Sequence, residues 1–232
     1  MDIVNAILII EACARMKRDL SYISSWRVLL AAMDRPSPLF TSSMIYRGIS
    51  CLKHLPLEDS NTRQYFKLMC KYIESSGVYL NANDVCPAIY SIQVLNNNFP
   101  EVKNLIQYLS KSLSQLTDTF QAKPICSAVY GLRKLRPTYE VRGLLSALAD
   151  KMEESEFYYH SVNICIALNG LQNMDDSYPE VRRILSVLMD KAIAADEQGM
   201  DRVTDRAISM ALFGKMRFRC QVYLSTVERL HS

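Results

Sequence analysis

Apolar residues recur along the chain at the spacing of α-helices. Between Ile125 and Leu135 they stand at the first, fourth, fifth, eighth and eleventh positions, which places them on one face of a helix. The stretch 141–152 follows the same rule. Linkers rich in Pro, Asn and Asp, such as 34–38 and 81–84, separate these amphipathic stretches. The pattern predicts an all-helical chain.

A short phrase of small and apolar residues recurs along the chain. Its copies are Ala88–Ser91, Ala128–Gly131, Ala167–Gly170 and Ala211–Gly214, with Gly48–Cys51 one unit earlier. The alanine-led copies begin 40, 39 and 44 residues apart. A second phrase follows the central copies as Pro100–Lys103, Tyr139–Arg142 and Pro179–Arg182. Two phrases in a fixed order at one period indicate a tandem repeat of helix pairs.

We therefore expect an all-α fold, a right-handed α-solenoid of about six helix-turn-helix units of roughly 40 residues, in one domain over 1–232. The expected units lie near 3–33, 43–74, 83–114, 123–153, 161–195 and 202–230. Within them we expect helices over 3–16, 25–33, 43–55, 61–74, 83–96, 100–114, 123–135, 139–153, 161–174, 179–195, 202–216 and 218–230.

Particular residues support this division into helix pairs. Pro100 and Pro179 suit the first turn of a second helix, where the missing N–H would have no partner in any case. The Glu after each Pro favours the positive end of the helix dipole. Ala128 and Gly131 are three residues apart on one face, and such small residues let a neighbouring helix approach closely.

Composition agrees with a folded helical chain and adds little about function. Hydrophobic residues make up 49% and charged residues 22%, which excludes a disordered chain. The 7 Gly and 8 Pro are too few for a fold of many short strands. The net charge of +3 permits a polyanionic partner without predicting one.

Cysteine usage and hydropathy bear on the compartment. The 7 cysteines include no close pair, so we expect free thiols in a reducing, intracellular compartment. No stretch has the length and apolarity of a membrane span, so no membrane partner is expected. The location would be mitochondrial or plastid if a presequence has been removed, and cytoplasmic otherwise.

No motif in the chain carries recognisable catalytic chemistry. The histidines His54, His160 and His231 are scattered, and no phosphate loop, zinc-protease motif or serine-hydrolase motif occurs. Cys86, Cys126 and Cys165 share one repeat position, but stacked helices lie about 10 Å apart. Because a Zn–S bond is about 2.3 Å, we expect buried packing there and no metal. The sequence thus predicts no enzyme, cofactor or small-molecule substrate.

The stretch Ala167–Met174, followed by Pro179–Arg182, resembles the helical repeats of organellar RNA-binding proteins. The texture is similar to octotricopeptide repeats and their relatives in proteins that carry a RAP domain, over residues 43–195. The Pro-Glu pair echoes that family's Pro-Pro-Pro-Glu-Trp-Trp motif, although no Trp follows it here. The resemblance implies an α-solenoid that binds single-stranded RNA.

Three rows of equivalent residues are candidates for contacting RNA. A polar row follows the Gly position of each unit, at Lys53, Gln93, Arg133 and Gln172. An aromatic row that could stack bases comprises Tyr90, Tyr130, Asn169 and Phe213. A basic row at the start of the second helices, able to contact phosphates, comprises Arg63, Lys103, Arg142 and Arg182.

Each row also has a structural interpretation, and two functions stay open. The polar row suits a solvated helix face, the aromatic row suits packing between units, and the basic row suits ion pairs with the neighbouring glutamates. We expect a non-catalytic binding scaffold whose partner is either single-stranded RNA or another protein.

Overall fold

A computed structural model describes residues 3–16, 26–34, 41–56 and 58–197 of the chain. Within these ranges the regular structure is entirely helical, which confirms the predicted all-α class. The α-helices are α1 (Ile3–Arg15), α2 (Trp26–Met33), α3 (Ser42–Cys51), α4 (Ser60–Ser76), α5 (Ala82–Ser91), α6 (Pro100–Ser114), α7 (Ala122–Tyr130), α8 (Tyr139–Glu153), α9 (Ser161–Gly170) and α10 (Pro179–Glu197). The expected unit near 202–230 lies outside the described residues.

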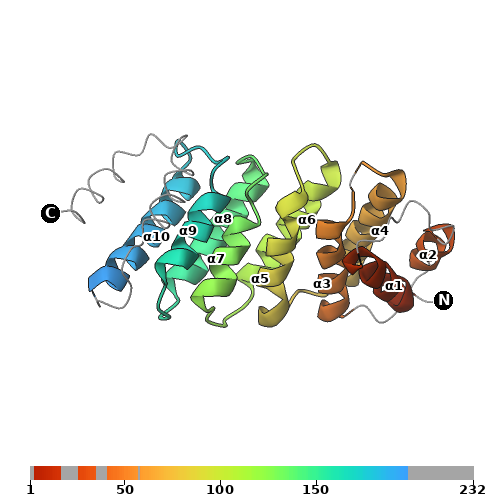
Figure 1. Cartoon of the computed structure of the whole chain (residues 1–232), viewed down its shortest axis with the longest axis horizontal. Helices are drawn as coiled ribbons and strands as arrows, with labels where there is room; N and C mark the ends of the chain where they lie inside the picture. The colour runs from red at the N-terminus through yellow and green to blue at the C-terminus, as the bar shows by residue number, and fades with distance from the viewer. Residues whose placement is uncertain (1–2, 17–25, 35–40, 57, 198–232) are drawn as a thin grey trace.

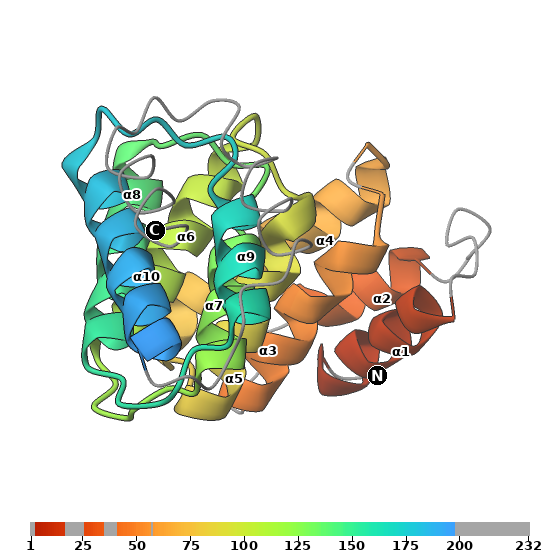
Figure 2. The same ribbon diagram turned by 60° about the vertical axis from the view of Figure 1, so that its left-hand side comes forward.

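The helices form two layers along an elongated molecule (Figure 1). One layer, here called the first-helix layer, contains α1, α3, α5, α7 and α9, each packed on the next. The second-helix layer contains α2, α4, α6, α8 and α10, packed in the same order. Figure 2 shows α6, α8 and α10 on one side of the molecule, apart from α5, α7 and α9. Each first helix also contacts the second helix that follows it.

The first helices end earlier than the sequence predicts. We expected α5 to reach residue 96, α7 to reach 135 and α9 to reach 174, but they end at 91, 130 and 170. A tight turn with hydrogen bonds between residues i and i+3 follows each of them, and after α3 and α5 it is a 3₁₀-helix, η2 (Leu52–His54) and η3 (Ile92–Val94). Apolar residues three apart fit both helix types, so periodicity does not separate them.

These turns recur in the four units that begin with α3, α5, α7 and α9, and they bury the same pair of side chains. Each turn closes with a backbone hydrogen bond, in which the N–H of an apolar residue donates to the carbonyl of the apolar residue three positions earlier. The donor–acceptor pairs are Leu55 to Leu52, Leu95 to Ile92, Leu135 to Leu132 and Met174 to Leu171. All eight side chains are buried. The turn therefore reverses the chain into the second helix while both of its apolar residues remain in the core.

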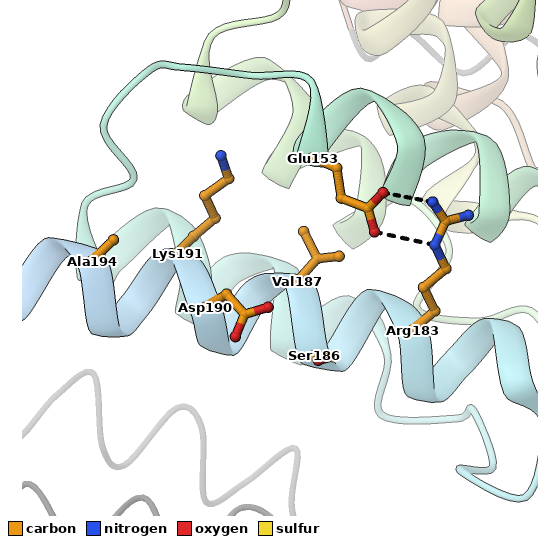
Figure 3. Close-up of a pocket in the computed structure, with 7 residues that line it drawn as sticks. All are labelled: Glu153, Arg183, Ser186, Val187, Asp190, Lys191 and Ala194. Carbon is orange, nitrogen blue, oxygen red and sulfur yellow. Dashed lines mark hydrogen bonds and ion pairs between the residues drawn. The ribbon is translucent and has the colours of Figure 1, made fainter.

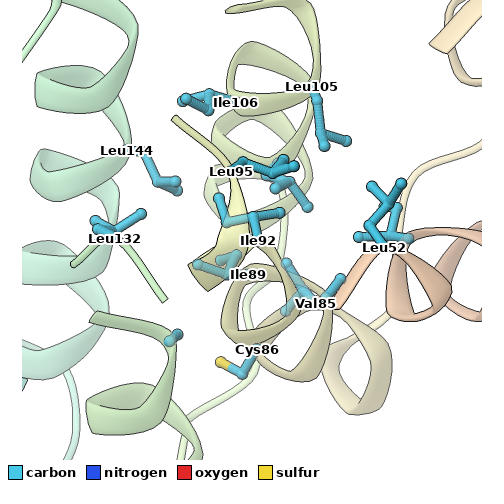
Figure 4. Close-up of a cluster of buried hydrophobic side chains, with 14 of the residues drawn as sticks. Leu52, Val85, Cys86, Ile89, Ile92, Leu95, Leu105, Ile106, Leu132 and Leu144 are labelled. Carbon is cyan, nitrogen blue, oxygen red and sulfur yellow. The ribbon is translucent and has the colours of Figure 1, made fainter. Parts of the chain in front are cut away.

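A single hydrophobic core runs between the layers from α1 to α10. Figure 4 shows part of it, where turn residues and helix residues of three successive units meet. The side chains labelled there are Leu52, Val85, Cys86, Ile89, Ile92, Leu95, Leu105, Ile106, Leu132 and Leu144. Cys86, Cys126 and Cys165 are all buried, which confirms the predicted packing role of this cysteine row.

Two glycines set the closeness of neighbouring first helices. A Cβ atom on Gly131 would lie 2.1 Å from the carbonyl oxygen of Ile89 in α5. A Cβ atom on Gly170 would lie 2.4 Å from the carbonyl oxygen of Val129 in α7. Both contacts are with backbone, which cannot move aside. The predicted close approach at the small residues is thus confirmed for α5 with α7 and for α7 with α9.

Candidate nucleic-acid interface

The predicted polar row lies along the edge of the molecule formed by the tight turns. Lys53 is in η2 and Gln93 is in η3, while Arg133 and Gln172 occupy the turns after α7 and α9. All four side chains are half-buried. The equivalent turns η2 and η3 contact each other directly. The row therefore consists of residues from successive units, as the sequence predicted, but on turns and not on a helix face.

The aromatic row lies on the adjoining surface of the first-helix layer. Tyr90, Tyr130 and Asn169 come from α5, α7 and α9, and each side chain is half-buried. The rings of Tyr90 and Tyr130 are stacked, with centroids 6.2 Å apart and planes 24° apart. The Arg133 guanidinium lies 4.8 Å from the centre of the Tyr130 ring and also donates a hydrogen bond to its hydroxyl. Phe213 lies outside the described residues.

This surface, here called the first-helix face, includes the outward side chains around the aromatic row. They are Asn83, Pro87, Tyr90, Val94, Lys123, Ser127, Tyr130, Lys134, Val162, Ile166, Asn169 and Asn173. All of them are half-buried or exposed. The face combines aromatic, amide, apolar and small side chains with two lysines, and none of these residues carries a carboxylate.

Carboxylates are almost absent from four first helices and their turns. The stretches 42–56, 82–98, 122–138 and 161–174 hold one acidic residue, Asp84, which accepts a 2.8 Å hydrogen bond from Ser42. The same stretches hold Arg47, Lys53, Lys123, Arg133, Lys134 and Arg136. The sequence analysis missed this difference in acidic content. It becomes visible in the sequence when charges are counted separately for the first and the second helices.

The basic row has a different role, because its members contact the following unit or their own turn. The Lys103 ammonium lies 3.2 Å from the Glu140 carboxylate, and Arg142 lies 3.8 Å from Glu180. These two ion pairs confirm the structural interpretation of Lys103 and Arg142. One unit earlier, Lys67, one helical turn after the basic-row residue Arg63, lies 3.9 Å from Glu101.

Aromatic and backbone groups hold the other two members of the basic row. The Arg63 guanidinium lies 5.2 Å from the ring centre of Phe99 in the next unit. Arg182 donates hydrogen bonds to the carbonyls of Asp176 and Ser177, just before its own helix. The basic row therefore mainly ties successive units together at the start of the second helices.

Hydrogen bonding at the start of α8 stabilises the charged form of Glu140. Its backbone N–H lowers the pKa of the carboxyl most, and hydrogen bonds with Lys103 and Thr138 lower it further. The ionised carboxylate then balances the cation from the preceding unit. This pairing explains why an acid precedes each basic residue in the second phrase of the repeat.

The second-helix layer carries a contrasting surface that pairs its own charges. Arg183 on α10 contacts Asp150 at 2.7 Å and Glu153 at 2.6 Å, both on α8. Figure 3 shows its contact with Glu153. A shallow cavity of about 490 Å³ lies beside this cluster, lined by Glu153, Arg183, Ser186, Val187, Asp190, Lys191 and Ala194. The sequence did not single out Arg183, since its equivalents Asn104 and Gly143 are uncharged.

Within the described part of the chain, no group of three His, Cys, Asp or Glu side chains could hold a metal ion. Burial raises the pKa of Cys86 to about 12, so its thiol is protonated and shielded. No helix in the described ranges is long and apolar enough to cross a membrane.

No family model, curated protein or solved structure matches this chain. The functional interpretation therefore depends on the chemistry of the two layers. The first-helix face combines stacked rings with unopposed positive charge, whereas the charges of the second-helix layer are largely paired with one another.

Proposed function

We propose that this chain is a non-catalytic binding scaffold, a right-handed α-solenoid of about six units of roughly 40 residues, whose first-helix face binds single-stranded RNA. The layered stacking of α1 to α10 supports the architecture. The sixth unit, near 202–230, belongs to the proposal because its Ala211–Gly214 phrase continues the repeat.

One observation carries the choice of RNA, namely the stacked pair of Tyr90 and Tyr130 in a region almost free of carboxylates. Any base of a single strand can stack on an aromatic side chain, so this contact does not depend on the nucleotide sequence. The stretch 119–139, which includes Tyr130, holds Lys123, Arg133 and Lys134 but no acidic residue, and the Arg133 guanidinium lies over the Tyr130 ring. The charge of these three residues suits the phosphates that link successive bases.

The candidate rows receive separate roles in this proposal. The aromatic row supplies stacking surfaces, and the polar row on the turns supplies donors to phosphates and base edges. The basic row contributes chiefly to the rigidity of the array, because Lys103 and Arg142 already pair with carboxylates. A rigid array holds the stacking surfaces at fixed intervals, which lowers the entropic cost of binding a flexible strand.

A protein partner is the second candidate, and one feature of the same face favours it. Val162 is 55% exposed on α9 and lies one turn from the half-buried Ile166. Pro87 occupies the position equivalent to Ile166 on α5. A row of apolar and small side chains along an extended surface suits a bound peptide as well as a nucleic acid.

The proposal is tested by titrating the protein with labelled single-stranded RNA of mixed sequence at about 50 mM and about 200 mM salt. Binding should weaken steeply with salt, as displacement of counterions from phosphates requires. A variant with Lys123→Gln, Arg133→Gln and Lys134→Gln should bind at least about tenfold more weakly at the lower salt, and its affinity should depend less on salt.

The matched control removes three positive charges from the second-helix layer, through Lys67→Gln, Lys71→Gln and Lys111→Gln. All three residues are exposed, and the ion pairs of Lys67 with Glu101 and of Lys71 with Asp34 lie at the surface, so the changes should affect stability little. The control should bind RNA nearly as well as the wild-type protein. Absence of binding at low salt, or equal losses in both variants, would contradict the proposal. Isolation of a stoichiometric protein partner that resists nuclease would support the second candidate instead.

A further inference from the structure

The rings of Tyr90 and Tyr130 lie near the long end of the range for stacked aromatic pairs. Their centroids are 6.2 Å apart, whereas aromatic pairs typically lie about 4.5–7 Å apart. The planes deviate from parallel by 24°. Both side chains are half-buried on the first-helix face, so part of each ring is open to solvent. The space between the two facing rings, where α5 packs on α7, is here called the slot.

The backbone beneath this slot is held at a fixed spacing. Gly131, the residue after Tyr130, lies against the Ile89 carbonyl and against the Cα atom of Tyr90. A Cβ atom there would come within 2.9 Å of that Cα atom. The helices therefore cannot close further at this point, and rotation of the two side chains changes the distance between the rings.

We propose that this slot takes up one unpaired nucleobase, sandwiched between Tyr90 and Tyr130, an inference that rests on the proposed RNA-binding function. Stacked bases lie about 3.4 Å apart, so a sandwiched base needs rings about 6.8 Å apart. The present separation falls short by about 0.6 Å, which small side-chain rotations supply.

The surroundings of the slot suit one nucleotide and not a longer stack. The position equivalent to the two tyrosines is Asn169 on α9 and the buried Ser50 on α3, so no further ring continues the row on either side among the described units. Arg133 lies over the Tyr130 ring, and Lys134, the residue that follows it in the chain, is exposed. These cations are placed to contact the phosphates that flank the bound base.

The test uses an oligonucleotide that carries one 2-aminopurine, a fluorescent purine, with every flanking position abasic. A single base fixes the register, and stacking between aromatic rings quenches its fluorescence. The wild-type protein should quench this probe and bind it about tenfold more tightly than a fully abasic strand, as one base–aromatic stack provides. Tyr90→Leu and Tyr130→Leu should each remove the quenching and that preference.

Two further variants separate stacking from damage to the fold. Tyr130→Phe retains the ring and should still quench the probe. Tyr79→Leu alters a second stacked pair, with Tyr108, whose centroids are 6.1 Å apart, and it should leave probe binding unchanged. Failure of the wild-type protein to bind mixed-sequence RNA would overturn the proposed function. RNA binding with an unquenched probe, or with quenching that survives both Leu variants, would overturn the sandwich alone.

Discussion

Gly131 and Gly170 occupy positions where two first helices meet backbone to backbone. The sequence predicted close packing there because small residues recur at one helical position. It did not predict the partner of each glycine. Gly48, which opens the equivalent phrase one unit earlier, lies against the side chain of Met69 in its own second helix. Gly48 aligns with Ala128 and not with Gly131, so the recurrence of small residues does not by itself identify what each glycine contacts.

Substitution of Gly131 by Ala should destabilise the protein by about 1–3 kcal/mol or more, because the new methyl group would overlap the Ile89 carbonyl. Gly143→Ala is the matched control. Its Cβ atom would meet nothing closer than Ser110 Oγ at 4.0 Å, and Ala favours the interior of α8 by about 0.8–1.0 kcal/mol. Urea denaturation should therefore show a lower free energy of unfolding for Gly131→Ala and a higher one for Gly143→Ala. A neutral Gly131→Ala would contradict the close contact.

The apolar periodicity predicted continuous helices where the structure has tight turns after the first helices. The apolar spacing from Ile125 to Leu135 fits one continuous α-helix, but the α-helix ends at Tyr130. Leu132 and Leu135 nevertheless lie in the core, as predicted, because residues three apart also share a face in a 3₁₀ turn. The sequence thus identified the buried residues correctly and the helix end incorrectly.

Shortening the turn side chain tests its contribution to the core. Leu135 is fully buried, and Leu135→Ala should lower the free energy of unfolding by about 2–5 kcal/mol through lost burial and a residual cavity. Lys134→Ala, at the exposed neighbouring position, should change it by less than about 0.5 kcal/mol. Thermal and urea unfolding measure both. Similar small effects would mean that the turn is not anchored in the core.

Ion pairs between units show what a sequence leaves undetermined about a candidate site. The basic row and its acidic neighbours were visible as a pattern, but either phosphate contact or pairing explained them. The pairing of Lys103 with Glu140 depends on the offset between α6 and α8, which only the stacked units define. For the polar and aromatic rows, the sequence identified the residues, and the structure shows that they lie on adjoining surfaces.

At the scale of the whole molecule, the two layers divide the chemistry. The second-helix layer holds more acidic residues than the first-helix layer, and contacts such as Arg183 with Glu153 neutralise many of its charges. The first-helix layer from α3 to α9 holds a single carboxylate, that of Asp84, and exposes rings, amides and cations. A polyanion should therefore approach the first-helix layer, where little negative charge repels it.

The most direct test of this account is photocrosslinking of bound single-stranded RNA that contains 4-thiouridine, with mass spectrometric mapping of the attached peptides. We predict crosslinks on the first-helix layer and its turns, centred on Tyr90, Tyr130 and the 131–136 turn. Crosslinks confined to the second-helix layer, around α6, α8 and α10, would contradict the account, as would an absence of specific crosslinks.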